Sequence, residues 1–369
     1  MMAGSTLNWY LARHFLRYVL FIYLLFLFLI MSVDMIELSR AASKRGESLF
    51  TEVFLIAALR APGLAQRVLP FAVLFGAATS LLLLTKKLEL VVARASGISV
   101  WRFIAPLLIA ASLVGGFTAL IYNPAALYAH RISQGVEADA FGRVKGSFTN
   151  KSKNFWLRTG QAGGEVIIRA GIAQDSGRKL TDVSIYRFGE GGAIKERIDA
   201  VEANFVSSSD AGNHYTLDRA VLTKPGEPSK SLATIKVPVN ISDSELQINS
   251  TLPSNVNFWS LGTQAERAAT AGRSPLPFQT HFQSLLVQPL LFVAMVLIAA
   301  GVSLRFARFG VNAKAILAGV LVGFVLYVIT KLLVTFGSNG LVPPFMAAWS
   351  SAIVASLLCI TVLLHQEDG

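Results

Sequence analysis

Few residues of this chain are of types that perform chemistry, and their spacing gives no recognisable catalytic centre. The single cysteine, Cys359, lies in an apolar run, which excludes an intramolecular disulfide and a thiolate metal site. The five histidines are scattered, without an HExxH motif or a paired spacing. The dipeptide Gly-Lys does not occur, so the sequence has no P-loop for ATP. We therefore expect a protein that is not itself an enzyme, with no catalytic, cofactor-binding or metal-ligating residues.

The segment 85–97, with the sequence TKKLELVVARASG, has the pattern of a short amphipathic helix. Leu88, Val91, Val92 and Ala95 fall at i, i+3, i+4 and i+7, which is one helical face. Glu89 projects from another face, and the final glycine is a natural helix stop. Two interpretations stay open from these residues alone. The helix either rests its apolar face in lipid headgroups, or it is presented to a cytoplasmic partner, where Glu89 pairs with a basic residue.

The elements that carry this segment are predicted to cross a membrane. Of the 369 residues, 53% are hydrophobic and 15% are charged, and the mean hydropathy is +0.54. A soluble domain usually has about 25% charged residues. The formal net charge of +11 is concentrated beside apolar stretches, as in membrane flanks, so no nucleic acid is expected as a partner. Charge-free intervals predict six transmembrane helices, in two sets of three, at 18–33, 68–85, 103–130, 274–304, 315–330 and 332–366.

Glycine and proline residues are expected to interrupt two of these predicted helices. The last one is expected to start after the glycines and prolines at 337–344. The stretch 49–85 is too long for one crossing, and Pro62, Gly63 and Pro70 are expected to break it near the outer interface. Lysines and arginines gather before the first helix and in the loops 86–102 and 305–314. These loops are therefore expected in the cytoplasm, together with both termini.

The polar insert between the two sets of helices has the pattern of a β domain. Apolar positions recur with period two, as at Val166 and Ile168 or Val183 and Ile185, and turn clusters separate the runs. Short strands at this spacing are typical of a sandwich, jelly roll or barrel. The predicted strands are 154–158, 165–172, 180–188, 193–205, 214–223 and 231–239. A loop and a short helix at 249–272 are expected to lead back to the membrane.

Two motifs in succession resemble the LptF/LptG permeases of lipopolysaccharide export. They are LPFAVLFG at 69–76 and LELVVARASGIS at 88–99. VQPL at 287–290, GFVLY at 323–327 and PFMAAW at 344–349 resemble the fourth and the last two spans of that family. The plan of three spans, a β insert and three spans matches across essentially the whole chain. The N-terminal region resembles LptG more than LptF.

The resemblance implies the transmembrane permease subunit of an ABC transporter. Such a subunit would pair with an LptF-like sister permease on an LptB-like ATPase dimer, which would bind the ATP and Mg²⁺. It would extract lipopolysaccharide from the Gram-negative inner membrane and pass it to a periplasmic bridge that includes an LptC-like protein. Segment 87–96 would be the coupling helix, with ATPase contacts from Leu88, Glu89, Val92 and Arg94.

The resemblance also implies basic side chains for the phosphates of the substrate. Arg131 and Lys331 are the foremost candidates at the outer rim of the transmembrane cavity. Each has an alternative role: Arg131 could pair with Glu137 or Asp139, and Lys331 could extend to lipid headgroups.

Three further cations, Arg40, Lys44 and Arg45, are weaker candidates because nearby glutamates could neutralise them. Lysines that the family often carries are matched here by Met31 and Gly63, so the basic contacts must differ in detail.

The insert would be the periplasmic jelly roll of the family. Its inward apolar residues, such as Phe155 and Ile168, would line a slide for acyl chains, and the alternative is that they fill a closed core. The expected fold is a polytopic α-helical membrane protein with an inserted all-β, jelly-roll-like domain. Its expected parts are 1–125 with helices 1–3, 126–273 with the β domain and return linker, and 274–369 with helices 4–6.

Two other classes of function stay open. A permease of another ABC exporter, for lipoproteins or other amphiphiles, would share the missing ATPase but usually has four spans and a different insert. A membrane-anchored periplasmic receptor would need a cytoplasmic output domain, and the predicted cytoplasmic parts are short loops.

Overall fold

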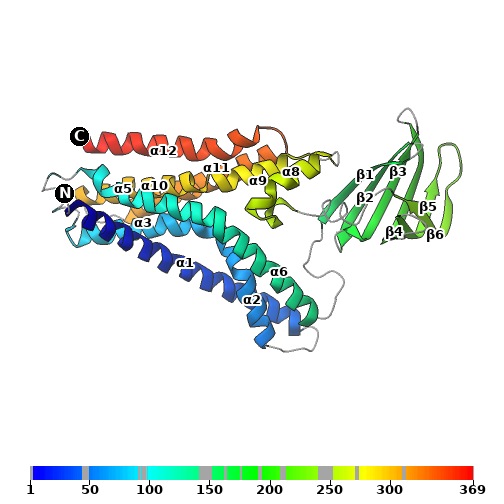
Figure 1. The fold of residues 1–369 in the computed structure, drawn as a ribbon, viewed down its shortest axis with the longest axis horizontal. Helices are drawn as coiled ribbons and strands as arrows, with labels where there is room; N and C mark the ends of the chain where they lie inside the picture. Colours follow the sequence, from blue (N-terminus) through cyan, green and yellow to red (C-terminus); the bar gives the residue numbers. More distant parts are fainter. Residues whose placement is uncertain are drawn as a thin grey trace. The chain divides into compact units, whose positions relative to one another are not determined.

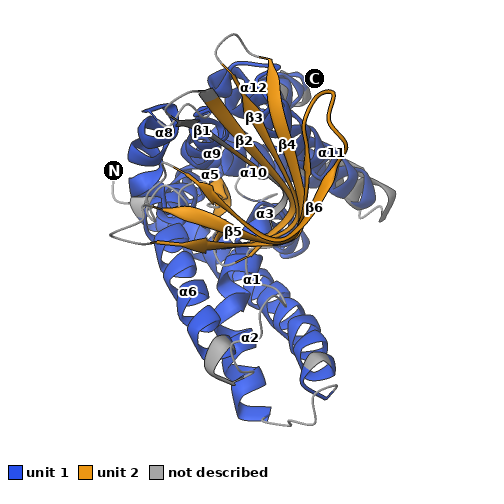
Figure 2. Ribbon diagram, turned by 90° about the vertical axis from the view of Figure 1, so that its right-hand side faces the viewer, with its two compact units in different colours: residues 1–140, 256–369 blue, residues 141–255 orange. Residues whose placement is uncertain are grey.

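The structure is a computed structural model that describes residues 3–43, 50–89, 92, 97, 99–140, 152–161, 164–174, 177–189, 193–207, 213–239, 252–270, 274–309 and 313–368. The chain forms two compact units, Met1–Ala140 with Val256–Gly369, and Phe141–Asn255 (Figure 2). The second unit is shorter than the segment 126–273 expected for the β domain and its linker. The reason is that α6 (Asn123–Ala140) continues the third apolar helix, while α8 (Leu261–Thr270) packs against α9 (Leu276–Leu286) in the first unit.

Five segments of the described chain are long and apolar enough to cross a membrane, and a bent helix pair makes a sixth if it counts as one span. The five are Thr6–Arg40, Phe50–Lys86, Val100–Glu137, Leu317–Ser338 and Pro344–His365. The bent pair joins α9 to α10 (Gln288–Phe309) at 49°. The expected six transmembrane helices are confirmed if the bent pair counts as one span. The expected β insert between the third and the fourth of them is confirmed as well.

The first and fifth helices are longer than the charge-free intervals that predicted them, whereas the last helix is shorter than its interval. Helix α1 runs over Ala3–Ser43, α11 over Ala313–Ser338 and α12 over Pro344–Asp368 (Figure 1). At 1.5 Å per residue the 41 residues of α1 span about 60 Å, twice the hydrocarbon thickness of a bilayer. Helix α12 begins at Pro344, after the predicted breakers.

The predicted break at Pro62 is wrong. Pro62 lies inside α2 (Phe50–Ala65), and the chain changes direction at the 3₁₀ turn η1 (Gln66–Val68) before α3 (Leu69–Lys86). Pro70 sits in the first turn of α3, where a missing N–H costs no helical hydrogen bond. Pro62 thus does not end its helix, whereas Pro70 stands at the start of one.

Helix α10 is central to the apolar core of the first unit, which α1, α3, α5 (Val100–Phe117), α11 and α12 share. Small residues bring these helices close together: a Cβ built on Gly115 of α5 would lie 2.5 Å from Pro289 Cα. A Cβ on Gly76 of α3 would lie 2.7 Å from Val19 Cα. Such close backbone contacts are the usual way in which membrane helices gain packing energy.

The second unit is a six-stranded antiparallel sheet in which each strand pairs with its neighbour in sequence. The strands are β1 (Ser152–Gln161), β2 (Gly164–Gln174), β3 (Lys179–Phe188), β4 (Ile194–Val206), β5 (His214–Thr223) and β6 (Lys230–Pro238). All six lie where the period-two pattern predicted them. The all-β insert is confirmed, and its described strands follow a meander order, whereas a jelly roll has Greek-key crossovers.

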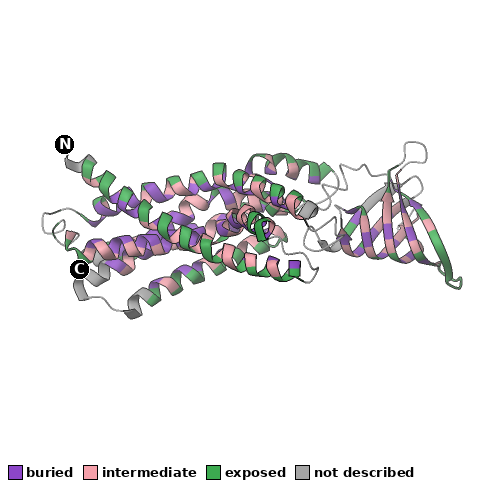
Figure 3. Cartoon of the chain, turned by 90° about the horizontal axis from the view of Figure 1, so that it is seen from below, coloured by how far each residue is buried: buried purple, intermediate pink, exposed green. Residues whose placement is uncertain are grey.

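One face of the sheet is apolar and buries its side chains against one another, because the sheet is strongly curved (Figure 2). Burial alternates along the strands, which Figure 3 shows as bands of colour. Tyr215 is the largest fully buried side chain, and its hydroxyl donates to the Gly177 carbonyl over 2.7 Å. Burial raises the pKa of Tyr215 above its ordinary value, so this hydroxyl stays protonated and keeps donating.

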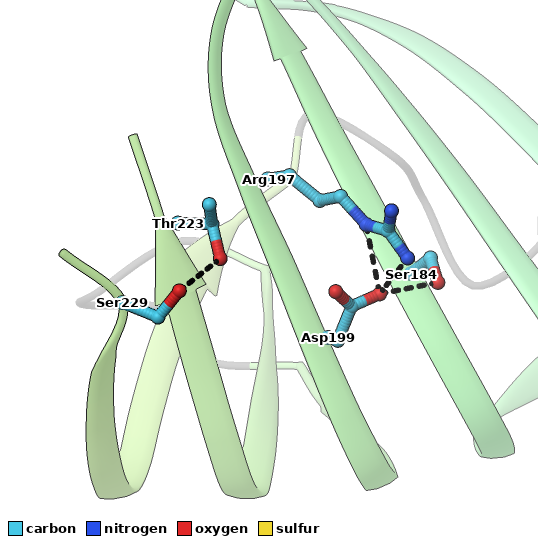
Figure 4. Close-up of polar contacts among 5 residues, drawn as sticks. All are labelled: Ser184, Arg197, Asp199, Thr223 and Ser229. Carbon is cyan, nitrogen blue, oxygen red and sulfur yellow. Dashed lines mark hydrogen bonds and ion pairs between the residues drawn. The ribbon is translucent and has the colours of Figure 1, made fainter. Parts of the chain in front are cut away.

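The other face carries polar side chains that bond across the strands (Figure 4). Ser184 of β3 donates to Asp199 Oδ1 of β4 over 2.6 Å, and Arg197 donates to the same oxygen over 2.8 and 3.1 Å. Thr223 and Ser229 are hydrogen-bonded over 3.2 Å between the ends of β5 and β6. This division into an apolar and a polar face fixes the register of the sheet.

Candidate functional site

The segment after α3 turns sharply before its own helical turn begins. Lys87 caps α3 and Leu88 has a positive φ of 63°, so the described turn starts at Glu89, two residues later than predicted. The Val92 N–H donates to the Leu88 carbonyl over 2.9 Å, as in an α-helix. Gly97 has a φ of 81°, as expected of a helix stop. Arg94 lies outside the described residues, and a helix over 87–96 stays a prediction.

Glu89 is held in place by a residue that the sequence did not single out. The hydroxyl of Tyr10, near the start of α1, donates to Glu89 Oε2 over 3.0 Å, with Oε1 at 3.4 Å. The flanking side chains of Leu88 and Val92 are 61% and 65% exposed. The Glu89 carboxylate thus accepts a hydrogen bond from α1 and stands in the sequence between two exposed apolar side chains.

The same end of α1 is tied to α3. His14 Nδ1 is hydrogen-bonded to Ser80 Oγ over 2.8 Å, and both side chains are buried. The rings of Tyr10, His14 and Tyr18 follow one another at i, i+4 spacing, with centroids 5.9 and 4.9 Å apart. Polar aromatic residues spaced by four in an otherwise apolar helix could have indicated from the sequence that this face of α1 contacts another polar residue.

The two foremost cation candidates lie on different helices. Arg131 is an exposed side chain of α6, and the ion pairs of the described residues do not include one with Glu137; the side chain of Asp139 lies outside that set. Lys331 projects from α11, and its Nζ lies 5.4 Å from the centre of the Tyr327 ring, one turn earlier. No contact among the described residues joins Arg131 to Lys331.

Of the three weaker cation candidates, the structure describes only Arg40. Arg40 is exposed near the end of α1, where it borders a shallow groove with Ser32 and Ile36. No ion pair with Glu37 is present among the described residues. Lys44 and Arg45 lie outside the part of the chain that the structure describes.

A buried ionic contact near this end of α1 was missed at the level of sequence. Asp34 is buried, and its Oδ1 lies 3.8 Å from Arg60 of α2, while Oδ2 has no hydrogen-bond partner among the described residues. Buried ionisable groups in membrane helices are costly and usually serve a function. The signal was an aspartate directly after the interval 18–33 and an arginine inside the next apolar stretch.

The two slide candidates belong to neighbouring strands. Ile168 of β2 is fully buried in the apolar cluster of the sheet. Phe155 of β1 is the Cα partner of Ala170, and its side chain lies outside the described set. In this conformation Ile168 is therefore a core residue, and access to a lipid would require the curved sheet to open.

These features define an integral membrane protein whose two sets of apolar helices flank an extramembrane β unit. The described residues contain no group of three or more potential metal ligands. In the described part of the chain, this arrangement leaves two apolar side chains exposed beside Glu89, and it leaves cations without a carboxylate partner elsewhere on the helices. It fits a transport subunit that is driven by a partner.

The chain belongs to the family described as lipopolysaccharide export system permease LptF/LptG, which matches residues 9–365. The lipopolysaccharide export system permease protein LptG of Escherichia coli K12 is 24% identical over 323 residues, which cover 84% of each chain. LptG of Escherichia coli O6:H1 is similar to the same extent. The resemblance found in the motifs is thus confirmed, and both relatives agree with the LptG-like N-terminal region.

The family defines the class of activity. The chain is a multi-pass membrane protein of the lipopolysaccharide export system, as a permease subunit of the Lpt ABC transporter that is not itself the ATPase.

Proposed function

We propose that this chain is the LptG-like half of a permease heterodimer in the Gram-negative inner membrane. It pairs with an LptF-like sister, and an LptB-like ATPase dimer binds ATP and Mg²⁺ on the cytoplasmic side. The permease takes lipopolysaccharide from the outer leaflet and delivers it to a periplasmic bridge with an LptC-like protein. The observation that carries this proposal is Glu89, which is anchored to α1 through Tyr10 between two exposed apolar side chains.

The anchored Glu89 supports a mechanical role. A partner that docks on Leu88, Glu89, Val92 and Arg94 would pull on the hydroxyl of Tyr10 and hence on α1. Helix α1 packs against α2, α3 and α5, so a movement of α1 would be passed on to these helices. Force from the ATPase would thereby reach a helix that borders the substrate path.

The insert supports the delivery step. Among the described strands, β1 and β6 each pair on one side only, so each has an edge that could bond to a strand of another domain. Edge-to-edge pairing would extend the curved apolar face from one protein to the next. Photo-crosslinkers at Phe155 and Ile168 test this: adducts with lipopolysaccharide during turnover support the slide, whereas their absence at both sites supports a closed core.

Transport in vesicles tests the proposal as a whole. The chain is reconstituted with its partner permease, the ATPase and the bridge protein, and ATP-dependent release of lipopolysaccharide is measured. If Arg131 and Lys331 contact the phosphates, reversing both charges (Arg131→Glu with Lys331→Glu) should abolish release, because the substrate is repelled. Arg131→Lys should already reduce release, since lysine cannot form two parallel hydrogen bonds with a phosphate.

A matched control is Lys224→Glu, which reverses an exposed charge in the turn between β5 and β6. This variant should release lipopolysaccharide like the wild type. Wild-type release by the double variant would contradict the assignment of these two cations, and no release by the wild-type assembly would contradict the proposed function.

A further inference from the structure

Three interruptions of helices lie beside one another in the first unit. Helix α2 gives way to α3 at η1, α5 gives way to α6 at the π-helical turn η2 (Thr118–Tyr122), and α9 meets α10 at a bend. Gly115, one turn before η2, is in close contact with Pro289, just after the bend. Ala119 of η2 shares an apolar cluster with Leu285, just before the bend. Prolines and π-helical turns are common causes of helix kinks, and here the kinks of neighbouring helices fall at one level.

Hydrogen bonds join η2 to the end of α2 and to η1. The Tyr122 hydroxyl donates to the Pro62 carbonyl over 2.8 Å, and the Asn123 amide donates to Gln66 Oε1 over 3.3 Å. The Tyr23 hydroxyl of α1 is hydrogen-bonded to that of Tyr122 over 2.5 Å. Asn123 is only 4% exposed, so the loss of a partner would leave a buried polar group unpaired. A change in one of these two breaks therefore disturbs the other.

A short 3₁₀ turn, η5 (Phe258–Ser260), is fastened to η2 and comes directly after the second unit in the chain. Its first N–H donates to Asn123 Oδ1 over 3.3 Å, and the indole N–H of Trp259 donates to the Leu120 carbonyl over 3.2 Å. In an α-helix the donor to this carbonyl would be residue 124, and Pro124 has no N–H. Trp259 thus supplies a hydrogen bond that an α-helix with this proline lacks.

The two contacts of η5 differ in strength. The side chain of Trp259 is 68% exposed, so water or a lipid headgroup can replace its hydrogen bond at little cost. Phe258 is buried, and its ring stacks on that of Phe282 of α9, with centroids 5.1 Å apart. Turn η5 therefore bridges η2 and α9 through one releasable contact and one buried contact.

Beyond the breaks, α2 and α6 pack along each other and diverge from α9, which packs against α11 and α12 (Figure 1). We call the pair of α2 and α6 the arm. Helix α1 is unbroken at this level and packs against α2 as well as α3. A swing of the arm would therefore tilt α1, which holds Glu89 through Tyr10 at its other end.

We propose that the three breaks form a joint about which the arm moves, and that η5 is a strap that holds this joint. A movement of the β unit would pull on η5 through the short connection that precedes it, and release of η5 would free η2. Hinges usually consist of a few residues at the ends of elements, which fits η1 and η2. The joint rests on the contacts of the helices, whereas its link to ATP hydrolysis through α1 rests on the proposed function.

The test measures distances between spin labels by electron paramagnetic resonance, in the full permease complex in nanodiscs. Cysteines at Gly135 of α6 and Gln279 of α9 report on the arm against α9, in a Cys359→Ala background with cysteine-free partners. Cysteines at Leu55 of α2 and Gly135 report on distances within the arm. All three labelled positions are exposed.

The variants each remove one donor and keep the ring. Trp259→Phe removes the indole N–H of the strap, and Tyr122→Phe removes the hydroxyl that bonds to the end of α2. The matched controls are Trp156→Phe in β1 and Tyr128→Phe in α6, whose exposed side chains have no hydrogen bond among the described contacts. Co-purification with the ATPase and thermal melting confirm that each variant assembles.

Each variant should increase the population of displaced arm positions about two- to fivefold, the shift that the loss of one partly exposed hydrogen bond produces. The distances between Gly135 and Gln279 should broaden accordingly, and those between Leu55 and Gly135 should not change, because the arm moves as one body. The two variants combined should multiply their effects, since both act on one equilibrium. Stimulation of the ATPase by lipopolysaccharide should fall in both variants, although Tyr10 and Glu89 are unchanged. The controls should behave like the wild type.

Unchanged distances across the joint in both variants would overturn the inference. Equal broadening within the arm would also overturn it, because it would show a loss of helix packing instead of a hinge. Broadening across the joint with wild-type ATPase stimulation would support the joint and refute its link to α1. A wild-type assembly that releases no lipopolysaccharide would contradict the proposed function, and the distances would still decide whether the joint exists.

Discussion

Replacing Tyr10 by Phe removes only the hydroxyl that donates to Glu89, and we expect it to weaken ATPase coupling. Hydrogen bonds to charged groups contribute ~1.5–3 kcal/mol. The side chain of Tyr10 is 43% exposed, and solvent screening reduces such contributions to about 0.5–1 kcal/mol. This free energy corresponds to a two- to fivefold change in an equilibrium constant, by about a factor of 10 for each 1.4 kcal/mol.

The assay is the affinity of the ATPase for the permease complex and its stimulation by lipopolysaccharide. Tyr10→Phe should lower both, and Glu89→Gln should lower them further. The double variant should resemble Glu89→Gln alone, because the hydroxyl then has no carboxylate to position. Tyr128→Phe is the matched control, since this tyrosine of α6 is 68% exposed and has no hydrogen bond among the described contacts. Additive losses in the double variant would refute the idea that Tyr10 acts through Glu89.

Three further changes test the packing and the docking surface. Gly115→Ala forces a Cβ against Pro289 and should cost ~1–3 kcal/mol in thermal melting, whereas Gly116→Ala, with open space around it, should be neutral or stabilising. Tyr215→Phe leaves the Gly177 carbonyl unpaired and should destabilise the sheet by ~1–3 kcal/mol, measured by hydrogen exchange across β3 to β5. Glu89→Lys should weaken co-purification with the ATPase while membrane insertion stays normal; full ATPase stimulation by this variant would show that Glu89 is merely solvated.

The sequence predicted the elements well where a repeating pattern carries the information. Period-two apolar positions such as Val183 and Ile185 place every strand, because each strand buries one face of the sheet. Charge-free intervals locate the apolar helices but not their ends, because α1 and α11 are longer than their intervals and α12 is shorter. Arg17 lies inside α1 and Lys331 inside α11, since long side chains can extend to polar surroundings from within a helix.

Contacts between distant residues could not be predicted from local pattern. Tyr10 and Glu89 are 79 positions apart, and nothing in either neighbourhood indicates the other. Asp34 and Arg60 meet only because α1 packs against α2. Pro62 is a different case: a proline usually ends a helix, but α2 continues through it, so the local sequence alone gave the wrong prediction. The meander order of the strands likewise depends on pairing that a linear pattern does not specify.

The π-helical turn η2 (Thr118–Tyr122) lies between α5 and α6 and changes the direction in which the side chains of α6 point. One additional residue in a turn rotates everything beyond it by about 100° about the axis. That rotation orients Asn123, which donates to Gln66 and accepts the Phe258 N–H. Deleting one residue from this turn would keep the helix but turn α6 away from both partners. The number of residues in this turn is therefore as important for these two contacts as the side chain of Asn123.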